Sequence, residues 1–249
     1  MRIFLLAVSF LTIIPAYGKR VADDKDMAGS LAYYPLLGFV IGAFLAALAY
    51  LGHYLNLGLA GTALVIVFWI VITGGLHLDG LMDTADGMFS GQERERKLEI
   101  MRDSRVGAMG VIALVALLLL KTSFLAALTY PDNLYMLIIA PAFARCMMVI
   151  SIYLFPYARS GPGLGKSFAD QAGWVHISMA AVTLLAGTFW LVRSNGLILL
   201  SLSAIPISLI IVWLARQLGG LTGDTYGAIC ELSETFFLIT AVIAGAIMA

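Results

Sequence analysis

The stretch GAMGVIALVALLLLKTSFLAALT, from Gly107 to Thr129, decides the class of this protein. It holds one charged residue, Lys121, and is long enough to cross a hydrocarbon layer of about 30 Å, which needs roughly 20 helical residues. Similar runs recur along the chain. The sequence predicts seven spans: Leu31–Leu51, Leu59–Leu76, Gly107–Thr129, Leu134–Phe155, Trp174–Val192, Leu197–Leu214 and Thr235–Ala249. We therefore expect an all-α, polytopic helical bundle that forms a single integral membrane domain over residues 1–249.

The composition of the whole chain agrees with this class. Apolar residues make up 61% of the 249 residues and charged residues 12%, about half the roughly 25% typical of a soluble domain. Fifteen basic and fifteen acidic residues leave no net charge, so nothing indicates nucleic acid as a partner. The two cysteines, Cys146 and Cys230, lie far apart in or beside apolar stretches. We expect both to be small core residues rather than a disulfide or zinc ligands.

The N-terminal segment Arg2–Pro15 is apolar but too short to span, and it lacks a cleavage site, so we expect a re-entrant or interfacial helix.

The loops on the two sides of the predicted bundle differ in charge. The loops on the side of the N-terminus hold twelve of the fifteen Lys and Arg residues, whereas the opposite loops hold only Arg193. By the positive-inside rule, the basic side is expected to be cytoplasmic.

An acidic motif follows the second predicted span. The stretch GGLHLDGLMDTADG (Gly74–Gly87) places Asp79, Asp83 and Asp86 at positions i, i+4 and i+7, within about 60° of arc on a helix. Three like charges on one stripe repel each other, so we expect a cation to neutralise them. Hard oxygen ligands suit Mg²⁺ or Mn²⁺. The alternative is a solvated helix end, where acidic residues near an N-terminus are also favourable.

A second acidic motif lies on the same predicted side. In GGLTGDTYGAICELSE (Gly219–Glu234), Asp224, Glu231 and Glu234 share one helical face. Carboxylates at a membrane edge are costly unless they face a cavity or a partner, so these three are catalytic candidates. An ordinary polar loop is the alternative. Together, the two motifs could hold two metal ions, an arrangement used for in-line displacement at phosphorus.

Four basic residues are candidates for binding a substrate phosphate: Arg105, Lys121, Arg145 and Lys166. Lys121 and Arg145 lie inside predicted spans, so they must face the bundle interior, paired either with an anionic ligand or with a structural carboxylate. Lys166 lies in GPGLGKS, which is one residue short of a phosphate-binding loop and follows no strand, so we reject a nucleotide loop there. For His77, a structural hydrogen bond is at least as well supported as catalysis, because it points about 200° away from Asp79.

These motifs are similar to those of one enzyme family. The stretches Thr73–Gly87 and Met101–Gly110, together with Gly219–Glu234, resemble the signatures of adenosylcobinamide-GDP ribazoletransferase, also called cobalamin 5′-phosphate synthase. The opening FLTIIP, the loop PYARSGPGLGKSF and the chain length also fit, so the resemblance covers nearly the whole chain. One position departs from the family pattern, since Leu78 stands where members usually carry an acidic residue.

The resemblance implies a multi-pass enzyme of the cell (inner) membrane with its active site on the cytoplasmic side. It implies a reaction that joins adenosylcobinamide-GDP to α-ribazole or its 5′-phosphate, releases GMP and requires Mg²⁺. Asp79, Asp83 and Asp86 would then hold Mg²⁺ on the diphosphate. The ribazole 3′-hydroxyl would attack the phosphorus, and Asp224, Glu231 or Glu234 would take its proton or bind a second metal. Expected partners are the corrinoid and ribazole substrates and membrane lipid, with a homo-oligomer left open.

Three other functions are compatible with acidic residues at a membrane face. A CDP-alcohol phosphotransferase needs an Arg after the alanine of its signature, but Asp86 follows Ala85 here. A prenyltransferase of the aspartate-rich type needs a second aspartate-rich motif, which the chain lacks. A secondary transporter would place its substrate site near the midplane, whereas these acidic groups cluster on one side.

Overall fold

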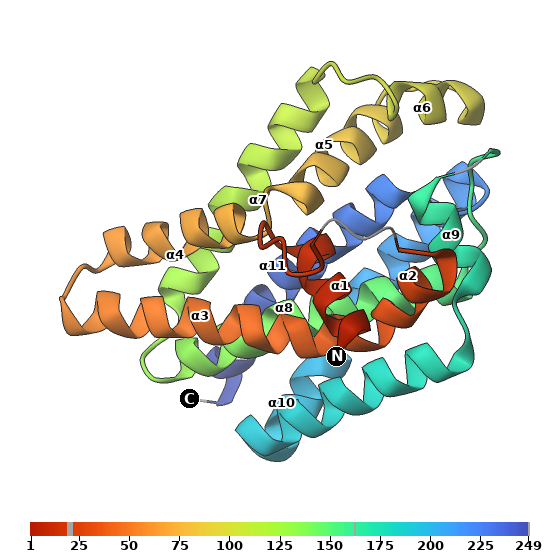
Figure 1. The fold of residues 1–249 in the computed structure, drawn as a ribbon. Helices are drawn as coiled ribbons and strands as arrows, with labels where there is room; N and C mark the ends of the chain where they lie inside the picture. The colour runs from red at the N-terminus through yellow and green to blue at the C-terminus, as the bar shows by residue number, and fades with distance from the viewer. Residues whose placement is uncertain (19–21, 162, 249) are drawn as a thin grey trace.

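The computed structural model describes residues 1–18, 22–161 and 163–248. Within these residues, helices joined by loops make up the fold, and the β-structure is limited to one isolated bridge between Tyr157 and Leu221 (Figure 1). The helices are α1 (Arg2–Leu11), α2 (Asp24–Ser30), the 3-10 turn η1 (Leu31–Tyr33), α3 (Tyr34–Tyr54), α4 (Leu59–Ile72), α5 (Leu76–Met88), α6 (Arg94–Ile100), α7 (Ala108–Ala127), α8 (Asp132–Leu154), α9 (Leu164–Gln171), α10 (Trp174–Leu218) and α11 (Gly223–Met248). The predicted all-α class is confirmed.

Within the described residues, five helices are long and apolar enough to cross a membrane, and a bent pair, α4 with α5, allows a sixth crossing. The predicted number of seven is therefore not confirmed. Helix α10 explains part of the difference, because its 45 residues include the two spans predicted at Trp174–Val192 and Leu197–Leu214. Its backbone is non-helical at Val192 and Arg193, and the chain turns back there (Figure 1).

Two predicted boundaries are wrong in ways that affect the acidic motifs. Helix α4 ends at Ile72 rather than at Leu76, because Gly74 and Gly75 adopt positive φ angles of 62° and 68°. Helix α5 then starts in a new direction, bent by 88° from α4. Helix α11 starts at Gly223 rather than at Thr235, so most of the second acidic motif is helical. The short N-terminal helix is present as α1, which ends at Leu11 rather than at Pro15.

Helix α8 lies at the centre of the bundle and packs closely against α3 (Figure 1). The contact depends on small residues of α3: a β-carbon at Gly42 would lie 2.5 Å from the Leu137 carbonyl oxygen of α8. Gly38 meets the backbone of α8 at Ala142 in the same way, so the pair forms a small-xxx-small contact between apolar helices. Cys146 and Cys230 are buried and unpaired, as expected.

The outer surface of the bundle is apolar. Large hydrophobic side chains are exposed along α4, α7 and α10, including Leu64, Val115 and Val182. A monomeric soluble protein rarely exposes such continuous apolar surface. The exposed faces therefore agree with a multi-pass membrane protein.

The loops gather at two opposite ends of the bundle. Helices α5, α6 and α9 lie at one end, together with the start of α11 (Figure 1). At the other end, the α3–α4 turn meets the α7–α8 turn, where His53 stacks on Tyr130. Both acidic motifs begin at the first end.

Candidate functional site at the start of α5 and α11

The bend between α4 and α5 brings the first acidic motif to the bundle. The Thr73 hydroxyl donates to the Trp69 carbonyl oxygen at 3.0 Å, and the backbone N–H of Ile13 donates to the Ile72 carbonyl oxygen at 3.0 Å. These bonds satisfy carbonyl groups at the end of α4. The segment that follows α1 thus contacts the chain just before α5 begins.

Helices α5 and α11 meet at two glycines. A β-carbon at Gly80 would lie 2.6 Å from the Asp224 carbonyl oxygen, and one at Gly227 would lie 3.1 Å from the His77 carbonyl oxygen. The absence of side chains at both positions lets the backbones approach. Asp79 of α5 and Asp224 of α11 consequently line the same cavity. The structure therefore brings the two acidic motifs together, as predicted.

Asp83 lies one turn after Asp79 on α5, which is not itself one of the five spanning helices. Partial burial and the nearby carboxylates of Asp224 and Asp79 together raise the pKa of Asp83 to about 6, against the lowering effect of Arg159. Asp79 itself is exposed, and Asp224 is partly buried. This concentration of negative charge favours a bound cation.

Asp86, the third member of the predicted metal triad, points to a different partner. Its carboxylate accepts the backbone N–H of Gly107 and that of Gly110, each at 2.8 Å. These are N–H groups at the N-terminus of α7 that have no partner within the helix, so Asp86 caps α7. Asp79, Asp83 and Asp86 lie on one helix at the predicted spacing. The Asp86 carboxylate, however, binds the N-terminus of α7, whereas Asp79 and Asp83 lie next to α11.

The donor set fits a metal that takes few protein ligands. Among the described residues, no three His, Cys, Asp or Glu side chains are close enough to hold a metal ion by themselves. The predicted triad therefore does not form a complete protein cage. Mg²⁺ is usually bound by one or two carboxylates, substrate phosphates and water. Asp79 and Asp83 match that requirement, and their role as ligands stays a prediction.

The first turn of α11 is held by two threonines. The Thr225 hydroxyl accepts the backbone N–H of Thr222 at 2.7 Å, and the Thr222 hydroxyl accepts the backbone N–H of Thr225 at 3.2 Å. The position of Asp224 is thereby fixed between them. A β-carbon at Gly223 would meet no atom within 4 Å, so the start of this helix is open to a ligand.

Arg159 is a site residue that the sequence reasoning did not single out. Its guanidinium pairs with the carboxylate of Asp224, and both side chains are largely buried. The backbone of the preceding segment pairs with the chain before α11: the N–H of Ala158 donates to the Leu221 carbonyl oxygen at 2.8 Å. The available signal was the PYARSGPGLGKSF loop, in which Arg159 precedes the glycine-rich part.

Four of the predicted site residues form a separate, buried network. The Lys121 ammonium of α7 donates to Glu231 at 2.7 Å and to Glu234 at 2.6 Å, and Arg145 of α8 pairs with Glu234. The Lys121 ammonium also lies 4.4 Å from the centre of the Trp69 ring. Two cations thus balance two carboxylates.

This network lies apart from the cavity that Asp224 of the same motif lines. All four side chains are at least 95% buried, and none of them lines the cavity that contains Asp79 and Asp224. The structure therefore shows the alternative in which Lys121 and Arg145 pair with carboxylates of the chain. Glu231 and Glu234 lie about two and three turns of α11 beyond Asp224, and they join α11 to α7 and α8 through Lys121 and Arg145. The catalytic and substrate-binding roles predicted for these four residues remain untested predictions.

The other two basic candidates are accessible. Arg105 lies in the loop before α7 and pairs with Asp103, whose pKa it lowers to about 2 through side-chain and backbone hydrogen bonds. Lys166 of α9 lines a groove of about 460 Å³ together with Arg159. Lys166 is therefore close to the acidic site, because it shares this groove with Arg159, which pairs with Asp224. Arg105 lies in the loop just before the N-terminus of α7, which Asp86 caps.

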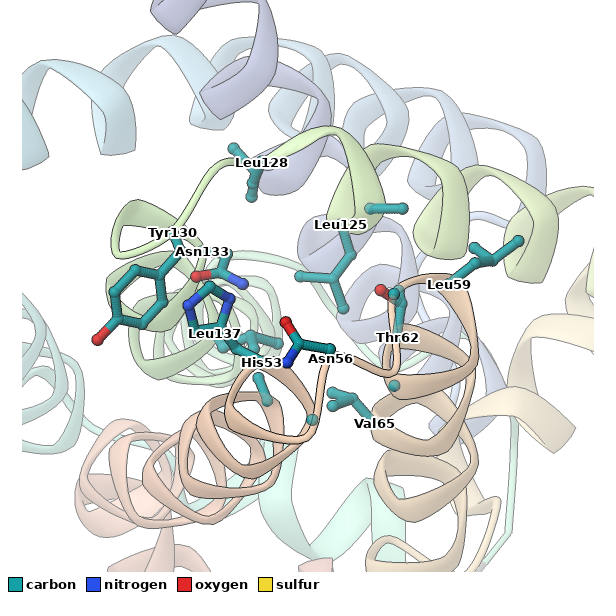
Figure 2. A pocket seen from close by; sticks show the side chains of 15 residues that line it. His53, Asn56, Leu59, Thr62, Val65, Leu125, Leu128, Tyr130, Asn133 and Leu137 are labelled. Atoms are coloured by element: carbon teal, nitrogen blue, oxygen red, sulfur yellow. The ribbon is translucent and has the colours of Figure 1, made fainter.

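A cavity at the opposite end of the bundle differs in chemistry. It measures about 510 Å³ and is lined by residues that include His53, Asn56, Thr62 and Asn133, with Tyr130 stacked on His53 (Figure 2). The lining holds no carboxylate, lysine or arginine. It therefore lacks both the carboxylates that suit Mg²⁺ and a cationic partner for a phosphate, and the acidic end is the better candidate for phosphoryl chemistry.

Comparison with known proteins identifies relatives along the whole chain. The family described as cobalamin-5-phosphate synthase matches residues 3–242. A protein of Desulforamulus reducens named adenosylcobinamide-GDP ribazoletransferase is 50% identical over 233 residues, covering 94% of this chain and 93% of its own. Proteins of the same name from a Roseiflexus species and from Desulfitobacterium hafniense are 43% and 40% identical, covering 94% and 97% of this chain and 87% and 96% of their own. No solved structure matches. These findings do not favour the phosphotransferase, prenyltransferase or transporter alternatives.

Proposed function

The chain belongs to the cobalamin-5-phosphate synthase family, and we propose that it joins adenosylcobinamide-GDP to α-ribazole at the acidic site formed by α5 and α11. The ribazole 3′-hydroxyl oxygen forms a bond to the phosphorus that carries the corrinoid arm. The bond between that phosphorus and the bridging oxygen of the diphosphate breaks, and GMP leaves. One observation carries the proposal: Asp79 and Asp224, from two distant motifs, line one cavity.

Each residue of the acidic site has a separate role in this proposal. Asp79 and Asp83 would hold Mg²⁺, which when bound supplies positive charge to the diphosphate oxygens and to departing GMP. Asp224 lines the cavity and accepts the proton of the attacking hydroxyl. Arg159, which pairs with Asp224, contacts the transferred phosphoryl group and keeps Asp224 in place. Lys166 lies in the groove beside Arg159 and contacts a more distant phosphate.

The orientation of the site in the membrane follows from the charges. The sequence places twelve of the fifteen Lys and Arg residues in loops on the same side as the two acidic motifs, which supports a cytoplasmic active site in the cell's inner membrane. The exposed apolar faces of α4, α7 and α10 support contact with membrane lipid. A cysteine-accessibility experiment in intact cells, with single cysteines at the exposed positions Ser104 and Asn56, tests this orientation. Labelling by an impermeant reagent is expected at Asn56→Cys and not at Ser104→Cys, and the reverse pattern contradicts it.

The reaction itself can be tested with purified protein in detergent. Adenosylcobinamide-GDP and α-ribazole are expected to yield GMP when Mg²⁺ is present, and EDTA is expected to stop its release. Asp132→Asn, at the opposite end of the bundle, serves as a control that retains activity. Absence of GMP release from folded protein with both substrates and Mg²⁺ contradicts the proposal.

A further inference from the structure

The cavity beside Asp79 and Asp224 has an aromatic wall. It measures about 220 Å³ and lies between α1, α3, α5, α8, α9 and α11. Phe10 stacks on Tyr34 at 6.4 Å between ring centres, and Phe168 lies 5.3 Å from Phe10 and 6.3 Å from Tyr34. Three rings from three helices thus line one side, which gives the short helix α1 a role in the site.

Three polar groups at the cavity lack partners. Tyr34, His77 and Tyr226 line it, and these residues are 0%, 3% and 4% exposed. The hydroxyls of Tyr34 and Tyr226 and the His77 Nδ1 atom have no hydrogen-bond partner among the described residues. A buried polar group without a partner is unfavourable, so these atoms are suited to a ligand. The helical angle between His77 and Asp79 predicts opposite directions, but in the structure both border this cavity.

The size and chemistry of the cavity restrict its occupant. Sites for whole drug-sized ligands measure roughly 300–1,000 Å³, so about 220 Å³ admits one fused ring system and excludes a corrinoid. A guanine edge carries several donors and acceptors side by side, whereas the three free polar atoms of this cavity come from three different helices and the rest of its lining is mainly apolar. A flat base with little hydrogen-bonding capacity fits better.

We propose that this cavity binds the aromatic base of ribazole, with the rings of Phe10, Tyr34 and Phe168 against the base and the Tyr226 hydroxyl donating to its free ring nitrogen. His77 then contacts a ribose hydroxyl. The ribose extends past Asp224, which places the 3′-hydroxyl next to the proposed proton acceptor. This inference rests on the proposed reaction, because it assigns one of the two substrates of that reaction to a subsite.

The test separates ribazole binding from turnover. Tyr226→Phe is expected to raise the Kd for α-ribazole, measured without the second substrate, by about three- to tenfold. The KM for α-ribazole should rise by the same factor, which corresponds to the loss of one hydrogen bond. The KM for adenosylcobinamide-GDP should stay within twofold of the wild type. Ile152→Phe, which adds volume to the cavity lining, is expected to reduce ribazole binding more strongly. Tyr33→Phe is the matched control, since Tyr33 packs on Phe4 outside the cavity and should leave both constants unchanged.

Two results overturn the assignment. One is wild-type affinity for α-ribazole in both Tyr226→Phe and Ile152→Phe. The other is an increase confined to the KM for adenosylcobinamide-GDP, which would place guanine in the cavity. Binding of α-ribazole, measured by calorimetry without the second substrate, does not depend on turnover. If the wild-type protein never releases GMP, the proposed reaction is contradicted. If Tyr226→Phe still weakens the binding of α-ribazole in that case, the proposed subsite is supported.

Discussion

Gly80 of α5 touches the backbone of Asp224 so closely that a β-carbon at position 80 would lie 2.6 Å from the Asp224 carbonyl oxygen and 3.1 Å from its Cα atom. This contact holds the two acidic motifs in register, because Asp79 and Asp83 flank Gly80 on the same helix. The site therefore depends on the absence of a side chain between two carboxylate-bearing segments.

Gly80→Ala is expected to separate α5 from α11. The added methyl group meets backbone rather than a movable side chain, so overpacking should cost about 1–3 kcal/mol of stability and lower GMP release strongly. Thermal unfolding in detergent and the GMP assay measure the two effects. Gly245→Ala, on α11 with open space around it, is the control and should change neither. Full activity of Gly80→Ala would show that the close approach is not required.

Asp83→Asn is expected to abolish turnover without loss of folding. The substitution removes a proposed metal ligand, so the rate should fall roughly 10²-fold or more, the usual cost of losing a transition-state contact. It also removes one of several repelling charges, so the unfolding temperature should be unchanged or higher. Preserved GMP release in the purified variant removes Asp83 from the metal site.

The raised pKa of Asp83 predicts a pH dependence of stability in metal-free buffer. The folded protein holds the Asp83 proton to about pH 6, whereas an unfolded aspartate loses it near pH 4. The folded state thus binds more protons in this window, so this residue's contribution to stability falls as the pH rises from about 4 to 6. Unfolding of wild type and Asp83→Asn should be compared across the window in EDTA. Parallel curves would contradict the prediction.

Arg159→Gln is expected to reduce GMP release, because Asp224 loses its charged partner and the transferred phosphoryl group loses a cation. Arg159→Lys should recover part of the rate, since it keeps the charge but not the planar fork of donors. Arg216→Gln, on an exposed part of α10, is the control. Equal rates for Arg159→Gln and the wild type would exclude the contact.

Lys121→Met is expected to destabilise the bundle by about 3–5 kcal/mol, because it leaves a buried carboxylate without its partner. Adding Glu231→Gln should restore part of the stability, since the double variant removes one charge of each sign. Thermal unfolding of the single and double variants measures this coupling. A raised KM for adenosylcobinamide-GDP in a Lys121→Met variant that unfolds like the wild type would instead support substrate binding by Lys121.

The sequence by itself determined the features that depend on local pattern. The length of the apolar run Gly107–Thr129 is sufficient for a membrane helix, because a bilayer leaves no other partner for the backbone of an isolated segment. The helical spacing of Asp79, Asp83 and Asp86 follows from 3.6 residues per turn. The charge difference between loops and the two acidic motifs were likewise readable without coordinates.

The tertiary structure decided which of these side chains meet. Asp86 has the same spacing as its neighbours on α5, but the N-terminus of α7 lies beside it and takes its carboxylate. Lys121 pairs with Glu231 and Glu234 only because α7 crosses α11 at that level. The cavity lined by Tyr226 and His77 likewise needs several helices to converge. Periodicity fixes the direction of a side chain from its own helix, whereas its partner depends on packing between helices that are distant in the chain.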